Sequence, residues 1–443
     1  MLLFAVTQFE LKTDPRPKGE PRDIAALAAR DDLRVVFILV DTLRADRIGS
    51  YGYARDTSPV IDYLAKTGIR FAHHHSQSSW TKTSMASLWT ALNPNRTGVL
   101  RAQDALPEAA RVPAEILRDA GYATIGLWRN GWVAPNFGFQ QGFDIYFNPT
   151  SGLMPGELRA NTRAGRVASS DIDVVLAAQE FLRTHHDRRF FLYLHLMDVH
   201  QYVTDEASAT FGTTYSDSYD NAIQWTDRQI GAVIAEIERL GLRDRTLIVV
   251  ASDHGEAFGE HGSEGHARNV FVEVTTTPWI ISLPFRLQES LVVRQSTSNV
   301  DVWPTLLEML GLSPLEDADG RSLLSALVGY PDEKGDPERL HFAQLDKTWG
   351  QVQRRPAPTY AVNSDSWRLI RGAEANRGDM LFDRVEDPSE QSDVAADHPE
   401  VAAELGSRID EYLKQDSVFG EIPRVELNDM ELRQLRALGY AVE

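Results

Sequence analysis

Three long apolar runs, each ending in an aspartate, constrain the fold of this chain more than any other feature. They are "LRVVFILVD" (Leu33 to Asp41), "RFFLYLHLMD" (Arg189 to Asp198) and "RTLIVVASD" (Arg245 to Asp253). Continuous apolar runs rich in β-branched and aromatic residues are typical of strands buried on both faces. Amphipathic helical segments lie between them, one ending at Gly121 and two covering residues 171–186 and 219–242. This alternation predicts an α/β fold with a doubly wound, mostly parallel sheet flanked by helices.

The pattern changes near residue 335. Segments 339–346, 359–373 and 379–385 are typical of short antiparallel strands, and a helical segment follows over 398–415. We therefore expect a main domain over 33–334, a small C-terminal α+β subdomain over 335–443 and an N-terminal arm over 1–32. The run "HHH" at 73–75 is expected in a loop or at a helix edge rather than in a metal cluster.

Composition limits the partners and the chemistry. The formal net charge of −19 disfavours nucleic acid, which needs basic patches. The absence of cysteine excludes disulfides, thiolate catalysis and cysteine-ligated metals. The apolar start, Met1 to Val6, is too short for a signal-peptide core or a membrane span, so we expect a soluble chain, in the cytoplasm or periplasm of a bacterial-type cell. The sequence leaves open whether the chain forms a homo-oligomer.

The three aspartates end strands whose carboxyl ends should meet at one edge of the sheet, where ligands bind in such folds. His254 directly follows Asp253. Carboxylates and an imidazole suit one divalent ion such as Zn²⁺ or Mn²⁺, whereas Mg²⁺ and Ca²⁺ favour more oxygen ligands. A lone aspartate at a strand end is more often a turn or cap residue than a ligand, and we expect Asp198 to have a structural role.

The stretch "WTKTSMASLWTALNPNRTGV", Trp80 to Val99, begins with hydroxyl side chains and continues as a helix-like segment. Thr81 is either a nucleophile or the cap of a helix that begins near Ser84. The sequence contains no G-x-S-x-G, Walker A, dinucleotide-glycine or H-E-x-x-H motif, which disfavours a serine hydrolase.

Together these segments resemble the sulfatase branch of the alkaline phosphatase superfamily, over roughly residues 33 to 443. The stretch from Val40 to Phe71 is similar to the family's opening strand and first metal ligand. "TKTSMASLWTALNPNRTG" stands where the family has C/S-x-P-S-R-A-x-L-x-T-G-x-x-P, and "HLMDVHQYV" resembles H-x-x-x-x-H-x-P-Y. "TLIVVASDHGEAFGEHGSEGH" is similar to the second metal strand, and "DVWPTLLEMLGL", "DGRSLL", "MLFDRVEDPSEQSDVAADHPE" and "LRALGY" to later landmarks.

The resemblance implies roles for nine residues. The implied metal ligands are Asp41, Asp253 and His254. The implied catalytic residues are the nucleophile Thr81 and two histidines that contact the anionic or leaving-group oxygen, His200 and, by a looser alignment, His266. The candidates for binding the substrate are Lys82, Arg129 and Asn130.

The departures from the family pattern bear on the chemistry. Sulfatases convert the motif cysteine or serine to formylglycine, which Thr81 cannot become, so no formylglycine is expected. Met85 replaces the motif arginine, and Thr42 replaces the second aspartate of the usual pair, which favours a single divalent ion. Lipoteichoic acid synthases and phosphopentomutases, by contrast, use an unmodified threonine.

These features predict a metal-dependent hydrolase of small anionic esters. The first hypothesis is a phosphodiesterase or phosphonate monoester hydrolase with a threonine nucleophile and promiscuous sulfatase activity. The alternatives are a sulfuric ester hydrolase similar to arylsulfatases and a catalytically degenerate, binding-only member. Asp46 is expected to form a cap or to pair with Arg44 or Arg47, and the sequence assigns no role to His261.

Overall fold

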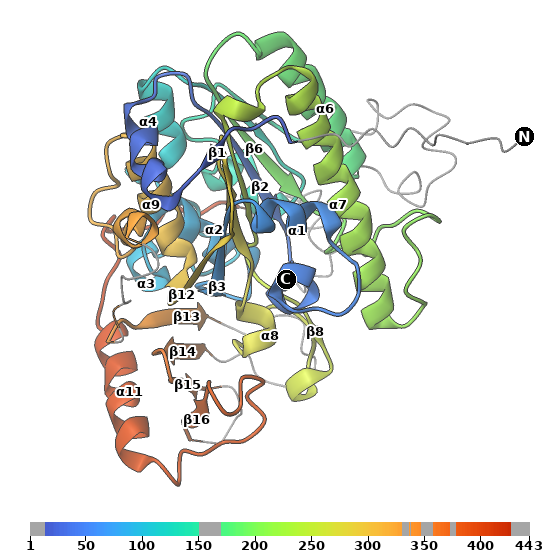
Figure 1. Cartoon of the computed structure of the whole chain (residues 1–443). Coiled ribbons are helices and arrows are strands. Elements are labelled where there is room, and N and C mark those ends of the chain that lie inside the picture. Colours follow the sequence, from blue (N-terminus) through green and yellow to red (C-terminus); the bar gives the residue numbers. More distant parts are fainter. Residues whose placement is uncertain are drawn as a thin grey trace, which may run out of the picture.

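An eight-stranded sheet forms the centre of the molecule (Figure 1). The computed structural model describes residues 14–149, 170–329, 336, 338–346, 358–372 and 378–426. The strand order is β12 (Leu291–Ser298), β3 (Ile69–His75), β10 (Trp279–Ser282), β7 (Thr246–Ala251), β2 (Arg34–Val40), β6 (Phe190–Leu196), β4 (Ala123–Leu127) and β5 (Ile145–Phe147). The three apolar runs of the sequence are the adjacent strands β7, β2 and β6, at the middle of the sheet.

The predicted mostly parallel sheet is confirmed, with β10 as its exception. Strands β7, β2, β6, β4 and β5 are parallel to one another. Strand β10 is antiparallel to both of its neighbours, β7 and β3, so β3 and its parallel partner β12 run in the same direction as β7. The carboxyl ends of β2, β3 and β7 therefore lie at the same edge.

The two faces of the sheet are covered by different helices (Figure 1). On one side lie α1 (Pro59–Lys66), α6 (Asp171–His185) and α7 (Tyr215–Arg239), and on the other α2 (Thr81–Thr90), α4 (Pro113–Asp119) and α9 (Val302–Met309). Alternate side chains of β2 point to opposite faces, as the pleat of a strand requires. Val36, Ile38 and Val40 join the core beneath α1, α6 and α7, whereas Val35, Phe37 and Leu39 join the other core. Each fully buried side chain of this kind contributes roughly 1.5–3 kcal/mol.

The described part of the N-terminal arm packs against the main domain. Strand β1 (Lys18–Gly19) pairs with β11 (Arg286–Leu287), and the 3₁₀ helix η1 (Pro21–Ala29) buries Ile24 and Leu27 in the core beneath α9.

The histidine run at 73–75 lies in a strand, not in a loop or at a helix edge as expected: His73, His74 and His75 end strand β3. His74 is buried and hydrogen-bonds with Thr297 and Asn299, which explains how a strand tolerates it.

The predicted C-terminal antiparallel sheet and helix are confirmed. The strands are β13 (His341–Leu345), β14 (Thr359–Asn363), β15 (Trp367–Arg371) and β16 (Met380–Asp383), in that order. Helix α11 (Pro399–Tyr412) packs Leu405 and Ile409 against this sheet. The subdomain is drawn in orange to red at the bottom of Figure 1. The landmark "LRALGY" lies outside the described residues.

Short elements connect these parts. They are α3 (Pro94–Thr97), α8 (Val272–Thr275), α10 (Leu324–Val328), β8 (Ala257–Phe258), β9 (Glu264–Gly265) and the 3₁₀ helices η2 (Ala45–Arg47), η3 (Gly49–Tyr51), η4 (Gly131–Val133), η5 (Pro135–Phe137), η7 (Arg243–Arg245), η8 (Glu260–Gly262) and η9 (Asn299–Asp301). Over the ranges that the structure describes, every helix is too short or too polar to cross a membrane.

Candidate metal centre and nucleophile

Asp41 directly follows β2 and is fully buried. Its backbone N–H donates to the carbonyl oxygen of Leu196 in the neighbouring strand, which fixes its position at the edge of the sheet. Oδ2 of Asp41 accepts two hydrogen bonds, from Nδ2 of Asn130 at 2.6 Å and from Nε2 of His195 at 3.0 Å. Oδ1 is buried and accepts none from the described residues.

Asp253 and His254 follow β7, next to β2, and are also fully buried. Oδ1 of Asp253 accepts hydrogen bonds from the backbone N–H of Thr42 at 3.2 Å and of His254 at 3.0 Å. Oδ2 has no hydrogen-bond partner in the described part of the chain. Nδ1 of His254 lies 3.0 Å from the carbonyl oxygen of Gly255. Because a carbonyl oxygen only accepts, Nδ1 carries the hydrogen and Nε2 keeps its lone pair.

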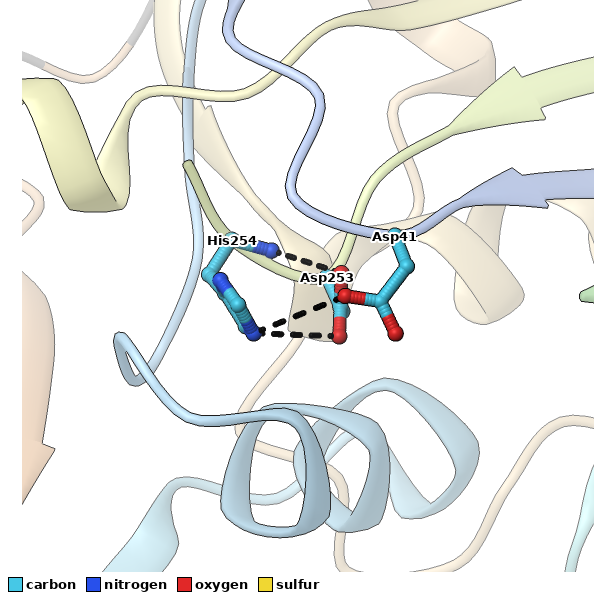
Figure 2. A group of neighbouring side chains, drawn as sticks. All are labelled: Asp41, Asp253 and His254. Carbon is cyan, nitrogen blue, oxygen red and sulfur yellow. Dashed lines mark hydrogen bonds and ion pairs between the residues drawn. The ribbon is translucent and has the colours of Figure 1, made fainter. Parts of the chain in front are cut away.

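The remaining ligand atoms of the three residues converge. Nε2 of His254 lies 3.4 Å from Oδ2 of Asp253 and 3.9 Å from Oδ1 of Asp41, and the three ligand atoms lie within 4.8 Å of one another. Figure 2 shows the imidazole and both carboxylates directed to one place. These two buried carboxylate oxygens accept no hydrogen bond from the described residues, and an imidazole lone pair lies beside them. Such a set of ligand atoms suits a divalent cation. The three predicted ligands therefore fit one such ion.

The two carboxylates have opposite pKa shifts. Burial and the negative charge of Asp41 raise the pKa of Asp253. Burial also disfavours the charged form of Asp41, but the hydrogen bond from His195 and the neighbouring histidines outweigh it and hold its pKa below the usual range. A pair of this kind is stabilised in its doubly ionised form by a bound cation. Thr42, at the position of the family's second aspartate, instead donates its hydroxyl to the carbonyl of Asp41.

Thr81 is the first residue of α2, and its hydroxyl faces the predicted metal ligands. Oγ1 lies 3.1 Å from Nε2 of His254 and 3.2 Å from Nδ2 of Asn130, and the side chain is fully buried. Trp80, not Thr81, precedes the helix as its N-cap. The cap interpretation is therefore wrong in both parts, since the helix does not begin near Ser84 and the Thr81 hydroxyl bonds to side chains.

His266 lies beside His254, and His200 lies beside His266. The ring centroid of His266 lies 4.6 Å from that of His254 and 4.9 Å from that of His200. Nδ1 of His266 lies 3.3 Å from the buried carboxylate of Glu256. Burial lowers the pKa of His200 to about 4. Burial also opposes protonation of His266, but Glu256 outweighs it and raises the pKa of His266.

The structure corrects the prediction that Lys82 contacts the substrate. Its Nζ donates to the carbonyl oxygens of Ala102 at 2.6 Å and Asp104 at 3.1 Å. The ammonium group also lies 3.1 Å from the ring centroid of Phe137, in a cation–π contact. Burial lowers the pKa of Lys82 well below its usual range. These contacts hold Nζ of Lys82 within the core.

Arg129 is likewise held by other side chains. Its Nη1 donates to Asp171 at 2.8 Å and to Asp198 at 2.5 Å, and its Nη2 donates to Gln201 at 2.8 Å. This buried network joins the start of α6 to the end of β6, which corrects the prediction that Arg129 binds the substrate. It also gives Asp198 the structural role that the sequence predicts.

Neither of two further acidic and histidine candidates belongs to the metal centre. Asp46 pairs with Arg44 at 2.6 Å, one of its two predicted partners. Nδ1 of His261 lies 3.0 Å from the carboxylate of Glu273.

Sequence reasoning assigned no role to three residues that the structure places at the site, His195, Tyr193 and Glu256. The hydroxyl of Tyr193 lies 2.7 Å from Nδ1 of His195, whose Nε2 bonds to Asp41. A signal existed for His195, because it is the one strongly polar residue inside the apolar run that forms β6. Glu256 lies in the densest cluster of titratable residues, but nothing in its spacing shows that it meets His266.

Two family profiles match the chain. The profile of the family described as Sulfatase matches residues 34–312, and that described as "N-sulphoglucosamine sulphohydrolase, C-terminal" matches 259–416. The chain is 24% identical to an N-acetylgalactosamine-6-O-sulfatase of Bacteroides thetaiotaomicron, with 85% of this chain and 92% of that protein covered. It is 26% identical to an ulvan-active sulfatase of Formosa agariphila, with 89% and 87% covered.

The fold matches a solved structure as well. The phosphonate monoester hydrolase of Agrobacterium radiobacter superposes with a TM-score of 0.68 at 19% identity, covering 86% of this chain and 95% of that chain.

Proposed function

The chain belongs to the sulfatase family of metal-dependent ester hydrolases, and we propose that it hydrolyses phosphodiesters, phosphonate monoesters or related phosphoryl esters with Thr81 as nucleophile. One observation carries the proposal: the intact hydroxyl of Thr81 lies 3.1 Å from Nε2 of His254, at the cluster of predicted metal ligands. A threonine supplies a hydroxyl there, and no route leads from it to formylglycine.

The metal would be held by Asp41, Asp253 and His254. A divalent cation bound there lowers the pKa of a neighbouring hydroxyl and offsets negative charge on the ester oxygens. Oδ2 of Asp41 and Oδ1 of Asp253 are already held by donors of the protein, so each carboxylate presents its other oxygen in a fixed direction.

Attack by Thr81 releases the hydroxyl proton to solvent, forms the bond from Oγ1 to phosphorus and breaks the bond from phosphorus to the leaving oxygen. The product of this step is an ester of Thr81 in which phosphorus keeps its remaining organic substituent, and water then hydrolyses this ester. In this proposal His200 and His266, whose ring centroids lie 4.9 Å apart, hold the leaving oxygen, and the one that is protonated donates its proton to it. The N-terminus of α2 favours negative charge at Thr81, because the N–H groups of a first helical turn point outward along the axis.

The nucleophile favours phosphoryl over sulfuryl esters. Formylglycine carries a second hydroxyl, through which the covalent sulfate is expelled by cleavage of a carbon–oxygen bond. Threonine lacks that group, so a sulfated Thr81 would persist as an alkyl sulfate. A phosphorylated Thr81 retains an electrophilic phosphorus that water attacks with the threonine oxygen as leaving group.

The charges near Thr81 favour esters with a single negative charge. Lys82 bonds to backbone carbonyls of the core, and Arg129 is bound by Asp171 and Asp198. Neither provides a second positive charge for a dianionic phosphate monoester. We therefore expect phosphodiesters and phosphonate monoesters to be turned over faster than phosphate monoesters.

Sulfate esters are the second candidate substrate class. They carry one negative charge as well, and the relatives from Bacteroides and Formosa are named as sulfatases. The name of the Agrobacterium structure, phosphonate monoester hydrolase, matches the first candidate, although its likeness is one of fold.

Hydrolysis of 4-nitrophenyl sulfate, phosphate, phosphodiester and phosphonate monoester by the metal-loaded protein tests the proposal. We expect phosphodiester turnover, and a loss of more than roughly 10³-fold in Thr81→Ala. Thr83→Ala is the matched control, because Thr83 lies in the same helix as Thr81 and its hydroxyl donates to the carbonyl of Val99. Wild-type turnover in Thr81→Ala, or faster turnover of the sulfate, would contradict the proposal.

A further inference from the structure

The side-chain amide of Asn130 is fixed at three points. Oδ1 accepts the backbone N–H of Trp132 at 2.9 Å and so caps the short helix η4. Nδ2 lies 2.6 Å from Oδ2 of Asp41 and 3.2 Å from Oγ1 of Thr81. The carboxylate of Asp41 accepts only, which identifies the nitrogen of the amide independently of the cap.

The hydrogen bonds of Asn130 leave it no donor for a substrate. An asparagine amide has two N–H donors, and these meet two acceptors, Asp41 and Thr81. The geometry therefore corrects the prediction that Asn130 binds the substrate. Oγ1 of Thr81 receives one of these hydrogens and lies 3.1 Å from Nε2 of His254.

We propose that Asn130 is a catalytic residue that acts on the nucleophile, by donating a hydrogen bond to the Thr81 oxygen whenever that oxygen carries negative charge. The inference rests on the proposed function, because it needs Thr81 to be the group that attacks. The same amide bonds to both Thr81 and Asp41, so it fixes the position of the reacting oxygen relative to a predicted metal ligand. A fully buried donor is effective here, since hydrogen bonds to charged groups are stronger than neutral ones.

The donor serves both halves of the reaction. During attack, the Thr81 hydroxyl gives up its proton to solvent and the bond from Oγ1 to phosphorus forms. The leaving oxygen departs with its electron pair and takes a proton from a site histidine. During release, a water oxygen bonds to phosphorus, the bond from phosphorus to Oγ1 breaks, and its electron pair returns to Oγ1. The water proton passes to the histidine that donated before, and Oγ1 regains a proton from solvent. Negative charge appears on Oγ1 in each half.

Two substitutions distinguish the role of Asn130 as a hydrogen-bond donor to Thr81 from its role as the cap of η4. Asn130→Ser keeps a side chain that caps a helix well but is too short to reach Thr81, whereas Asn130→Ala loses both functions. We expect kcat for 4-nitrophenyl phosphodiester to fall about 10²-fold in both variants, as for loss of one donor to a reacting oxygen. KM should change by less than roughly threefold, because no contact with the ground-state substrate is removed.

Binding of inorganic phosphate gives a readout that does not depend on turnover. The dissociation constant, measured by calorimetry on the metal-loaded protein, should be the same in wild type and Asn130→Ser. Weaker phosphate binding or a raised KM with unchanged kcat would restore the substrate-binding role and overturn the inference. A loss of kcat in Asn130→Ala alone would overturn it in favour of a structural cap.

The two proposals fail in different ways. If Thr81→Ala keeps wild-type turnover, the proposed nucleophile is wrong and Asn130 has no reacting oxygen to serve. If Thr81→Ala is inactive while Asn130→Ser turns over like wild type, the proposed function stands and the role of Asn130 is wrong.

Discussion

Removing one hydroxyl group, in Tyr193→Phe, tests how the protein holds its predicted metal ligand. Nε2 of His195 carries a hydrogen because it bonds to the acceptor-only carboxylate of Asp41 at 3.0 Å. In the neutral imidazole, Nδ1 of His195 then accepts the hydrogen of the Tyr193 hydroxyl at 2.7 Å. The Tyr193 ring packs against Trp89 at a centroid distance of 5.0 Å, a contact that phenylalanine keeps.

The magnitude of the effect follows from the lost bond. The variant leaves Nδ1 of His195 buried without a donor, which costs about 1–3 kcal/mol of the free energy of unfolding. Substitution of groups that support a metal ligand typically weakens binding 10- to 100-fold. Tyr193 acts on Asp41 through His195, so we expect the low end, about a tenfold rise in the dissociation constant, or ~1.4 kcal/mol.

Calorimetric titration of metal-stripped protein with Mn²⁺ measures this constant, and urea unfolding measures stability. Tyr412→Phe is the matched control, because it removes a buried hydroxyl that donates to Gln344 at 2.7 Å and lies in the C-terminal subdomain. We expect a comparable loss of stability without a change in metal affinity. Unchanged Mn²⁺ affinity in Tyr193→Phe, or an equal loss in Tyr412→Phe, would refute the reasoning.

Three further predictions concern the metal, the titration of Glu236 and the close packing of Gly320 against backbone atoms. Chelation with EDTA should abolish ester turnover and Mn²⁺ should restore it; full turnover after chelation would contradict a metal-dependent reaction. Hydrogen bonds from Arg239 and Arg183 lower the pKa of Glu236 from 4.5 to about 2, so its stabilisation is present above pH 4.5 and is lost as the pH falls toward 2. Glu236→Gln should lower the free energy of unfolding at pH 7, and urea titrations should show its difference from wild type narrowing below about pH 4.5; a constant difference would contradict the assigned pKa. Gly320→Ala should lower the thermal midpoint, because its Cβ would lie 1.7 Å from a carbonyl oxygen, whereas Gly378→Ala, with no atom within 4 Å, should leave it unchanged; equal midpoints would contradict the predicted clash.

The centre of the sheet could be predicted because its strands carry their own signal. The runs that form β2, β6 and β7 are apolar at every position, as burial on both faces requires. Strand β3 escaped prediction because it ends in three histidines. His74 is buried there only because Thr297 and Asn299, more than two hundred residues later, supply its hydrogen bonds. Local pattern cannot reveal such a partner.

The same limit separates the predicted site residues that the structure brings together from those that it does not. Asp41 and Asp253 end adjacent strands, so a rule about strand ends sufficed to place them together. The roles of Arg129 and Lys82 depended on what else lies nearby. Arg129 forms ion pairs with two aspartates, and Nζ of Lys82 donates to backbone carbonyls. A charge near a site in sequence is available to a substrate only if the fold leaves it without partners.

The ligand atoms are ordered by the protein before any cation is considered. Each carboxylate has one oxygen bound by two donors, from Asn130 and His195 for Asp41 and from backbone N–H groups for Asp253. His254 is oriented in the same way by the carbonyl of Gly255. These hydrogen bonds engage Oδ2 of Asp41, Oδ1 of Asp253 and Nδ1 of His254. The other ligand atom of each side chain is directed toward the cluster. A cation bound between the two buried carboxylates would relieve their mutual repulsion, which favours its binding. Thr81 lies beside this predicted cation site.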